Sequence, residues 1–388
     1  MKVVLVHPHD LWRDPWTIRI LALARGLKQR GHEVALCHMP RKDAPSHAPL
    51  RTPSPDDPPI YEFKPRQQHA LSNYRLLLEL CADCDVIHLQ KCFPASTLPV
   101  LWAARALNKP IHYDWDDDET AISRLVEKRG LARFHLASYE AQLPRFANTV
   151  TYASRALHDR AAALGFAEER MFHLPVGADL QRFHPNGGDA NALRDFGLGP
   201  DKPTVLYVGQ LEGAAHPHWL VDAAPLVLKS TPDAQFLFVG GGEQLEDLQA
   251  HVAASSARNA IYVGGYIEHD RVPALVGCAT VCVACFDDDP ATRAKSPLKI
   301  AEYLAAGRAI VVSDVGDAPW MVEGCGVAVA PESVPALAVG ITAYLNDPQK
   351  READGRRARQ RAEQLFNWEH GVDTLLKAYE KCITIDSV

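Results

Sequence analysis

The sequence predicts an α/β protein built from two doubly wound, Rossmann-like domains. Apolar strand-like segments alternate with amphipathic helical segments through the first half of the 388-residue chain, beginning at 3–7 and 18–30. A glycine-containing stretch at 186–189 then precedes a second alternation of the same kind, which starts at residue 204. Such alternation is typical of parallel sheets covered by helices, so we expect two domains that face each other across a cleft.

Both domains are expected to contain strands and helices in regular succession. For the first domain we predict strands at 3–7, 33–38, 86–90, 110–115 and 149–153, helices at 18–30, 76–82, 98–107 and 154–164, and a helical region at 119–146. For the second we predict strands at 204–209, 234–240, 261–264, 281–284 and 309–313, and helices at 219–229, 243–254, 272–278 and 297–306. A proline-dense stretch at 40–65 is expected to be a long surface loop, because proline disrupts helices and central strands.

Composition excludes several classes of protein. The net charge of −7 gives no global electrostatic case for binding nucleic acid. The N-terminus lacks the pattern of a signal peptide, and no apolar run is long enough to span a bilayer. The nine cysteines are therefore expected to be reduced thiols in a cytoplasmic protein. Two CxxC pairs, at 81/84 and 282/285, lack a matching ligand set, so core packing is favoured over zinc or redox chemistry.

A helix over 297–306 is clearly signalled at both ends. Ser296 is a good N-cap, and Pro297 suits the first helical position because its missing N–H is not needed there. Gly307 falls where a left-handed residue is expected to end the helix. The boundaries of this helix matter because of the charges that surround its start.

Three cations crowd the start of this helix: Arg293, Lys295 and Lys299. The helix dipole favours acidic side chains at this end, so the arrangement breaks a local rule. A bound anion would compensate, because free N–H groups at helix N-termini often hold phosphates. We favour an anion site over the alternative of three solvated cations on a loop.

Short motifs along nearly the whole chain resemble, in order and spacing, those of the family 4 retaining glycosyltransferases. They are Gly-His-Glu-Val at 31–34, Asp-Val-Ile-His at 85–88, the run at 175–185 that begins Pro-Val-Gly-Ala-Asp, Val-Leu-Tyr-Val-Gly at 205–209, Phe-Val-Gly-Gly-Gly at 238–242, Val-Gly-Gly-Tyr at 263–266 and Leu-Lys-Ile-Ala-Glu-Tyr-Leu-Ala-Ala-Gly at 298–307. The resemblance implies the two-domain GT-B architecture. It also implies an acceptor-side domain at 1–187, a nucleotide-sugar-binding domain at 188–368, and a C-terminal helix at 369–388 that crosses back to the first domain.

The resemblance also implies roles for single residues. Glu302 matches the glutamate that binds the ribose of the donor, and the backbone before it receives the diphosphate. The residues implied for diphosphate binding are Ser296, Leu298 and Lys299, and the other expected donor-binding residues are Arg293, Gly209, Gln210, Gly240, Tyr266 and Ile267. Lys295 and Lys299 are expected to act as catalytic cations that stabilise the leaving diphosphate.

Three positions depart from the family pattern. A second glutamate, which contacts the donor sugar in the family, falls on Ala294, and an arginine and a lysine common in the family fall on Gln210 and Ala215. Their absence fits an inactive relative, or a protein in which Lys295 and Lys299 have taken over the diphosphate. We favour the second interpretation, because chains with the same helix motif resemble this one and lack the same residues.

Acidic residues follow the strand predicted at 110–115. Family members place a polar residue that faces the donor sugar there, so Asp116 or Asp117 is expected to make this contact and to be catalytic. A metal-binding aspartate cluster and a solvated acidic loop are the alternatives. GT-B enzymes neutralise the leaving diphosphate with helix N-termini and cations, so no metal and no cofactor besides the nucleotide-sugar co-substrate are expected.

The loop at 7–17 replaces the family's usual glycine-rich loop. Arg13 and Trp16 are expected on the acceptor side, and the indoles of Trp12 and Trp16 could stack on a sugar or lipid group. A hydrophobic staple on the following helix explains these tryptophans nearly as well. Basic residues at 124–145 fit an anionic membrane surface or a lipid-diphosphate acceptor, but an ordinary charged helix face is the default.

These observations predict a retaining transferase that moves a sugar from a nucleotide-diphosphate-sugar to a saccharide, a lipid-linked saccharide or a small metabolite. Front-face transfer with the leaving phosphate as base is expected, because no residue is a secure covalent nucleophile. Closure about 186–188 would bring Asp116 or Asp117 to the donor. The alternatives are a non-catalytic relative that binds a nucleotide-sugar or a partner transferase, and another GT-B chemistry such as epimerisation or phosphorolysis. The nucleobase, sugar and acceptor stay open.

Overall fold

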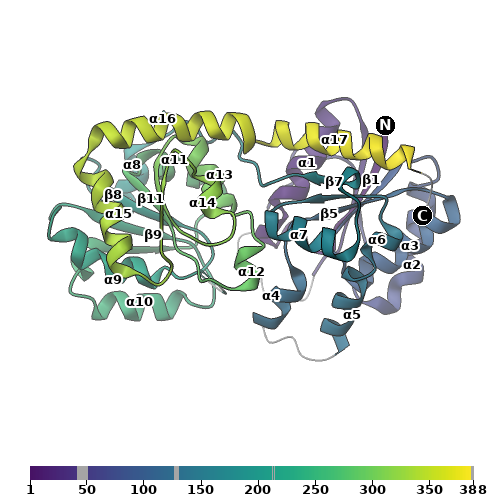
Figure 1. The fold of residues 1–388 in the computed structure, drawn as a ribbon, viewed down its shortest axis with the longest axis horizontal. Coiled ribbons are helices and arrows are strands. Elements are labelled where there is room, and N and C mark those ends of the chain that lie inside the picture. Colours follow the sequence, from purple (N-terminus) through teal and green to yellow (C-terminus); the bar gives the residue numbers. More distant parts are fainter. Residues whose placement is uncertain (42–50, 126–130, 212, 214, 386–388) are drawn as a thin grey trace. The chain divides into compact units, whose positions relative to one another are not determined.

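The structure, a computed structural model, describes residues 1–41, 51–125, 131–211, 213 and 215–385. The chain divides into two compact units, each built on one parallel sheet (Figure 1). Unit 1 contains Met1–Pro175, Ala294–Ser296 and Trp368–Val388, and unit 2 contains Val176–Arg293 and Pro297–Asn367. The predicted α/β class with two parallel sheets is confirmed.

Unit 1 has a seven-stranded parallel sheet of order β3-β2-β1-β4-β5-β6-β7. The strands are β1 (Lys2–Val6), β2 (Glu33–His38), β3 (Ile60–Glu62), β4 (Val86–Gln90), β5 (Ile111–Trp115), β6 (Thr149–Tyr152) and β7 (Met171–His173). The helices are α1 (Ile18–Gln29), α2 (Ala70–Leu80), α3 (Pro94–Leu107), α4 (Glu119–Leu125), α5 (Leu131–Glu140), α6 (Leu143–Phe146), α7 (Arg155–Leu164) and α17 (Trp368–Thr384). The strand order reverses between β1 and β4, and ligands of doubly wound sheets bind at such a switch point, beyond the carboxyl ends of the strands.

Successive residues of the unit 1 strands enter two different cores, because side chains alternate between the faces of a sheet. In β1, Val3 and Leu5 lie in one core with residues of α1 and α17, whereas Val4 and Val6 lie in the other with residues of α2, α3 and α7. Figure 1 shows α17 running beside α1. Coverage on both faces explains why every residue of β4 and β5 is buried, the polar ones included.

Two stretches of unit 1 differ from the sequence prediction. Residues 60–62, inside the proline-dense stretch expected to be a loop, form β3 and pair with 36–38 of β2. Proline is tolerated beside an edge strand, which needs ladder hydrogen bonds on one side only. The helical region expected at 119–146 is divided into α4, α5 and α6. Lys128 and Arg129, two of its basic residues, lie outside the described residues.

Unit 2 has a six-stranded parallel sheet of order β10-β9-β8-β11-β12-β13. The strands are β8 (Thr204–Val208), β9 (Gln235–Val239), β10 (Ile261–Gly265), β11 (Val281–Ala284), β12 (Ala309–Ser313) and β13 (Val327–Val329). The helices are α8 (Ala190–Arg194), α9 (His218–Leu228), α10 (Leu245–Ala254), α11 (Val272–Cys278), α12 (Pro290–Arg293), α13 (Leu298–Ala305), α14 (Ala318–Met321), α15 (Val334–Asn346) and α16 (Pro348–Leu365). Its switch point lies between β8 and β11.

The helices of unit 2 lie on both faces of its sheet. Apolar residues of α9, α10 and α15 form one core with the strands, and α13 packs against α16 (Figure 1). Helix α13 starts soon after β11 and returns the chain to β12. This βαβ connection brings the start of α13 to the carboxyl edge of the sheet, because a crossover helix begins where its preceding strand ends.

The glycine pair predicted as a hinge packs against unit 2. A Cβ atom added at Gly188 would lie 2.8 Å from the backbone of Gly277. Nearby, Arg308 donates a hydrogen bond to the carbonyl oxygen of Pro185 (2.9 Å). These contacts tie 186–188 to unit 2, and the division between the units falls between residues 175 and 176, earlier than the predicted boundary at 187.

All nine cysteines are free, and both CxxC pairs are buried, as expected of core residues. Burial raises the pKa of the Cys285 thiol to about 12, so this thiol is not a reactive thiolate. Among the described residues, no helix combines the length and apolar character needed to cross a membrane.

Candidate functional site

Helix α13 starts later than predicted, and the expected N-cap is wrong. Pro297 is the N-cap, with an extended ψ of 116°, and Leu298 is the first helical residue. Ser296 therefore lies one residue too far from the helix to cap it, and no side chain takes that role. Gly307 follows the helix in the left-handed conformation (φ 64°), as expected. An α-helix has no internal acceptors for its first N–H groups, so an uncapped start suits an anion.

Lys299, in the first turn of α13, reaches the carboxyl end of β8. Its ammonium donates a hydrogen bond to the hydroxyl of Tyr207 (3.0 Å) and lies 4.2 Å from the centroid of that ring. The Tyr207 hydroxyl in turn donates to the carbonyl oxygen of Gln210 (3.2 Å). A cation–π contact and a hydrogen bond thus fix the position of Lys299, which is not a freely solvated cation on a loop.

Two predicted glycines allow the backbone to approach Lys299. A Cβ at Gly209 would lie 2.4 Å from Lys299 Nζ, and a Cβ at Gly240 would lie 1.7 Å from the carbonyl oxygen of Gly209. Both glycines have φ near 150° (149° and 152°), where side chains are strained. Tyr266 and Ile267 follow β10 at the same edge of the sheet, and Tyr266 is exposed. Gly209, Gly240 and Lys299 thus meet at the end of β8, whereas β10 lies two strands away in the sheet.

Glu302 is buried one turn further along α13, with 5% of its side chain exposed. Its Oε1 lies 2.7 Å from Nε2 of His269, whose ring contacts Phe183 at 5.9 Å between centroids. Sequence reasoning missed His269, because nothing in its local sequence connects it with a residue 33 positions away. A carboxylate has several acceptor positions, so Glu302 can keep His269 as a partner and still accept from a hydroxyl.

The other two predicted cations have different surroundings. Arg293 donates to both carboxylate oxygens of Asp288 (2.6 and 2.8 Å), and both side chains are exposed. Asp288 therefore supplies an acidic partner that the sequence argument did not count. Lys295 groups with unit 1. Of the three predicted cations, Lys299 is the one that α13 itself carries to the end of β8.

The positions that depart from the family pattern are filled in different ways. Ala294 belongs to a core cluster of unit 1, and its carbonyl oxygen accepts a hydrogen bond from Ser154 Oγ (2.7 Å). Gln210 is exposed, and Ala215 forms a backbone bridge with Phe286. Ala294, at the family's glutamate position, thus packs in an apolar core. Ala215, at the family's lysine position, takes part in backbone pairing.

A histidine lies next to the family's lysine position. His216 Nε2 is 2.5 Å from Asp287 Oδ2, and the imidazole stacks on Trp219 with 5.0 Å between centroids. Asp287 follows β11 and His216 precedes α9, so the pair spans the unit 2 switch point. Sequence reasoning passed over His216 because the family pattern places the basic residue one position earlier.

A second cluster of polar side chains lies at the carboxyl ends of β4 and β5 in unit 1. Lys91 is buried directly after β4, and its Nζ lies 3.3 Å from Asp116 Oδ1, 2.9 Å from Asp117 Oδ2 and 2.5 Å from Glu119 Oε1. The structure thus brings the two predicted aspartates together around a lysine that sequence reasoning missed. The solvated acidic loop considered as an alternative is wrong for these two residues.

The two aspartates have different proton affinities. Burial raises the pKa of Asp116 to about 7, although Lys91 attracts its carboxylate. Burial would also raise the pKa of Asp117, but Lys91 and Lys295 outweigh it and hold that pKa below its ordinary value. Near neutral pH, Asp117 is therefore a carboxylate, while Asp116 sits close to its titration point.

The neighbouring aspartates are paired with arginines. Asp114, buried in β5, accepts two hydrogen bonds from Arg19 (2.8 and 2.7 Å), and Asp118 forms an ion pair with Arg160. Side chains held in this way are poor metal ligands, because their oxygens already have cationic partners. Within the described ranges, no group of three or more histidines, cysteines, aspartates or glutamates is arranged to hold a metal ion.

His7, on the other side of the unit 1 switch point, is linked to this cluster of polar side chains through Gln90. Its Nδ1 lies 2.7 Å from Gln90 Oε1, and Gln90 Nε2 donates to Asp116 Oδ2 (3.1 Å). Burial lowers the pKa of His7 to about 3, so the imidazole is neutral. Because the Gln90 oxygen accepts, the single proton belongs on Nδ1. The buried Nε2 is then an acceptor with no hydrogen-bond partner among the described residues.

The loop between β1 and α1 carries the predicted acceptor-side residues. Arg13 Nε lies 3.8 Å from Asp10 Oδ2. Trp16 is 39% exposed and meets the His9 ring edge-on, with 5.8 Å between centroids. It is Trp12, not Trp16, that packs against the core shared by α1. The exposed indole of Trp16 therefore retains surface for a ligand.

We expect Asp116→Asn to stabilise the protein at alkaline pH. The folded pKa of about 7 exceeds the ordinary value, so this carboxyl contributes stability below its unfolded pKa that is lost as the pH rises through about 7. Near pH 8.5, the midpoint temperature of unfolding should be higher in the variant than in the wild type, by about 2–4 °C for each kcal/mol gained in the free energy of unfolding. Near pH 5 this difference should be smaller. Calorimetry on Asp116→Asn and on the exposed control Asp56→Asn tests this; equal differences at both pH values would contradict it.

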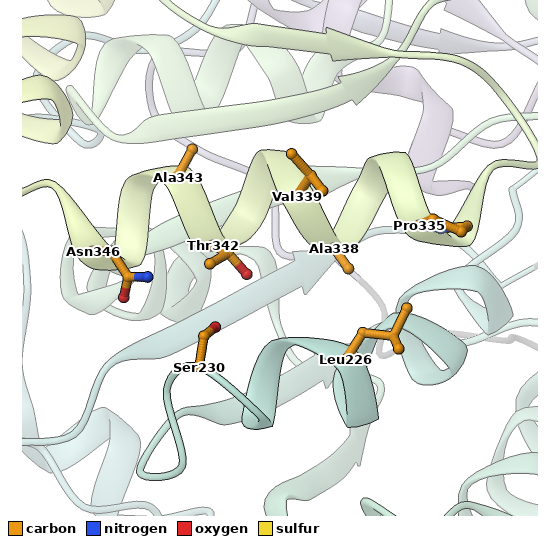
Figure 2. Close-up of a pocket in the computed structure, with 8 residues that line it drawn as sticks. All are labelled: Leu226, Ser230, Pro335, Ala338, Val339, Thr342, Ala343 and Asn346. Atoms are coloured by element: carbon orange, nitrogen blue, oxygen red, sulfur yellow. The ribbon is translucent and has the colours of Figure 1, made fainter.

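An open pocket of about 510 Å³ lies between α9 and α15 (Figure 2). Leu226 and Ser230 line it on one side, and Pro335, Val339 and Thr342 on the other. No residue predicted for the site lines it. The residues that line the pocket come from α9, α15 and the residues just beyond them, and none comes from α13, which carries Lys299, so the pocket is not part of the candidate site.

The fold defines a class of protein. Two doubly wound units, each built on one parallel sheet covered by helices, are the architecture of the GT-B glycosyltransferases. Family models agree: Glycosyltransferase Family 4 matches residues 17–182, and Glycosyl transferases group 1 matches residues 202–347. The chain belongs to this family of glycosyltransferases.

Known proteins resemble the chain to different extents. The GDP-mannose-dependent alpha-(1-6)-phosphatidylinositol monomannoside mannosyltransferase of Mycolicibacterium smegmatis is 30% identical over 229 residues, which are 58% of this chain and 59% of that protein. Across the curated relatives it matches, the chain spans about half of their length.

Solved structures share the fold over almost the whole chain. Sucrose-phosphate synthase of Thermosynechococcus elongatus has a TM-score of 0.74 at 21% identity, with 98% of each chain covered. The Anabaena protein HepE, in complex with UDP and glucose, has a TM-score of 0.76 at 17% identity, with 98% of this chain and 99% of its own covered. At these identities the likeness concerns the fold alone.

Proposed function

We propose that the protein transfers a sugar from a nucleotide-diphosphate-sugar to a hydroxyl group of a saccharide, a lipid-linked saccharide or a small metabolite. The observation that carries the proposal is the position of Lys299. Its ammonium is fixed over Tyr207 beside Gly209, at the uncapped start of α13 and the switch point of the unit 2 sheet. A fixed cation at a helix start that no side chain caps suits a diphosphate.

The reaction we propose is a front-face displacement. The bond between the anomeric carbon and the leaving phosphate oxygen breaks while the acceptor oxygen bonds to the same face of that carbon. The acceptor proton passes to the departing phosphate oxygen, so no covalent sugar–enzyme intermediate forms. Lys299 and the start of α13 stabilise the charge of the departing diphosphate, and a single preorganised group of this kind typically contributes about 3–4 kcal/mol. Lys295 is proposed as a further cation for this step.

The carboxylates of unit 1 supply the polar contact to the sugar in this proposal. Asp117 is ionised, and Asp116 has a buried oxygen, Oδ1, with no hydrogen-bond partner among the described residues. An acceptor of this kind matches the hydroxyl groups of a sugar. Positive charge develops on the anomeric carbon as the leaving group departs, and nearby carboxylates stabilise it. The two residues thereby keep the roles inferred for them from the resemblance.

Glu302 is proposed to accept hydrogen bonds from the donor ribose. His269 holds its carboxylate in place from outside α13 (2.7 Å), which reduces the rotamer freedom that binding would otherwise have to restrict. The similar proteins differ in the nucleotide of the donor. HepE is in complex with UDP and glucose, and the Mycolicibacterium enzyme is GDP-mannose-dependent, so the nucleobase has to be found by experiment.

We expect the transfer to proceed without a divalent metal. Lys299 and the α13 start provide the positive charge that a metal ion would otherwise bring to the diphosphate. Activity measured in excess EDTA should therefore equal activity with added Mg²⁺ or Mn²⁺, within about twofold. A loss of tenfold or more in EDTA that returned on adding either metal would contradict this expectation.

A second candidate is a non-catalytic protein that binds a nucleotide-sugar or a partner transferase. The observation that favours it is Ala294, which makes a core contact where the family has a glutamate that faces the donor sugar. Incubation with UDP-, GDP-, ADP- and dTDP-sugars, with and without candidate acceptors, separates the two. Acceptor-dependent release of nucleoside diphosphate supports transfer, whereas tight binding without release across the panel supports the second candidate.

A further inference from the structure

Lys91 has an unusual place in unit 1. It follows β4 directly, at the switch point of the sheet, and only 4% of its side chain is exposed. Its backbone is left-handed (φ 62°), a conformation that strains a residue with a side chain and that clusters at functional sites. Asn108 shares this conformation as the C-cap of α3, where it is ordinary, but Lys91 ends no helix. The strain therefore calls for another explanation.

The contacts of the Lys91 ammonium supply one. It donates hydrogen bonds to Asp117 (2.9 Å) and Glu119 (2.5 Å), and it lies 3.3 Å from Asp116 Oδ1. All three carboxylates come from the segment after β5, so one side chain connects the ends of two neighbouring strands at the switch point. The geometry of the Lys91–Asp116 pair leaves Oδ1 without a hydrogen bond among the described residues, although the atom is buried.

We propose that Lys91 is a positioning residue. Its ammonium holds the side chains of Asp116 and Asp117 next to each other, so that the Asp116 oxygen without a hydrogen bond can accept one from a substrate hydroxyl. The inference rests on the proposed function for its substrate, but the arrangement of charges that it describes belongs to unit 1 alone.

The charged and titratable groups around the two aspartates come from several elements. They are Lys91 after β4, Asp114 on β5, Arg19 on α1, His7 after β1, Glu119 on α4 and Lys295 in the segment that groups with unit 1. Arg19 is engaged by Asp114 through two hydrogen bonds, and His7 is neutral. Among the described residues, Lys91 is the cation in contact with both aspartates, so its removal should disfavour both carboxylates.

The first test is a titration that does not depend on turnover. Carbon-13 NMR of protein labelled at aspartate carboxyls follows Asp116 and Asp117 against pH in the wild type, Lys91→Met and Lys91→Arg. We expect Lys91→Met to move the Asp117 titration upward by at least about one pH unit, a tenfold change in proton affinity, while Lys91→Arg keeps the wild-type titration. The surface variant Lys64→Met serves as a matched control and should change nothing.

The second test uses activity. With whichever sugar nucleotide is turned over, the acid limb of the kcat/KM profile should move upward in Lys91→Met and stay in place in Lys91→Arg. Affinity for the nucleoside diphosphate should be unchanged in both, because that ligand is assigned to unit 2. A protein that binds nucleotides and shows the titration shift but transfers no sugar would sink the proposed function and leave the role of Lys91 in holding the carboxylates intact.

Each outcome bears on the proposal. An unchanged Asp117 titration in folded Lys91→Met would overturn it. Lys91→Gln, which keeps hydrogen-bond donors without the charge, takes the same test if Lys91→Met does not fold, with the same shift expected. The wild type provides a further check independent of any variant: an Asp117 carboxyl that titrates at the ordinary value for aspartate, about 3.9, or above it would also overturn the proposal.

Discussion

Lys299→Ala is expected to weaken the binding of nucleoside diphosphate at least tenfold, or about 1.4 kcal/mol. The ammonium is fixed by Tyr207 at the end of β8, so its charge is already in place when a diphosphate arrives at the start of α13. The effect on turnover should be larger, about 3 kcal/mol or a hundredfold in kcat, because negative charge on the diphosphate grows as the sugar departs. Isothermal calorimetry and steady-state rates measure the two effects.

Two controls separate the charge of Lys299 from its packing. Lys299→Met keeps most of the aliphatic chain against Tyr207, so it should lose as much affinity as Lys299→Ala while keeping more stability. Lys229→Ala removes an exposed lysine at the end of α9 and should leave both affinity and rate unchanged. Unaltered calorimetric affinity in both Lys299 variants would remove α13 from the donor site and, with it, the main support for the proposed function.

The α13 region shows how far sequence reasoning reached. The helix and its left-handed Gly307 follow from local signals at the two helix ends. Gly209 and Gly240 were expected as donor-binding residues, but their close approach to Lys299 and to each other emerges only from the structure. The N-cap was misplaced by one residue, because proline fits both the N-cap and the first helical position and only its backbone angles distinguish them. Local signals define an element well and its boundaries less well.

The residues that sequence reasoning missed share a different property. Lys91, His7 and His269 act through partners 26, 83 and 33 positions away along the chain. No local pattern marks such a residue. Lys91 and His7 become important only when strand order brings the ends of β1, β4 and β5 together, and His269 only when the segment after β10 meets α13. Conversely, Arg293 stood out in the sequence but pairs with Asp288, five positions earlier. Because Asp288 balances its charge, Arg293 does not indicate an anion site. Charge near a helix start indicates a site only once its local partners are known.

A contact that the sequence does not reveal also explains why the division between the units falls at 175/176 and not at 187. Gly187 and Gly188 look like a linker because glycine is common where a chain must be flexible. In the structure, Gly188 has a different use: it allows its backbone to touch that of Gly277, where a Cβ would lie at 2.8 Å. Glycine permits both flexibility and close approach, and the sequence alone does not separate these two uses.

Arg19→Met is expected to have the largest effect on stability of any single change considered, about 3–5 kcal/mol of unfolding free energy. Arg19 on α1 donates two hydrogen bonds to Asp114 on β5 (2.8 and 2.7 Å), and both side chains are buried. Burial would raise the pKa of Asp114, but Arg19 and a hydrogen bond from Thr151 hold it below its ordinary value. Without the guanidinium, the carboxylate stays buried with its main cation gone.

The dependence on pH follows from the direction of that shift. A carboxyl whose folded pKa is lowered contributes stability that is present above its unfolded pKa, about 3.9, and is lost as the pH falls through the folded value. The loss caused by Arg19→Met should therefore be full at neutral pH and shrink below about pH 4. Urea unfolding at several pH values measures it.

Two further variants make the result interpretable. Arg25→Met removes another α1 arginine, whose ion pair with Asp57 is more exposed, and should cost less than about 1 kcal/mol. The double variant Arg19→Met/Asp114→Asn removes both charges and should recover much of the loss, because the cost of Arg19→Met lies in the carboxylate left behind rather than in the missing contact. If Arg19→Met proved no more harmful than Arg25→Met, the buried pair would not anchor α1 to the sheet. The carboxylate group beside it would then need another source of rigidity.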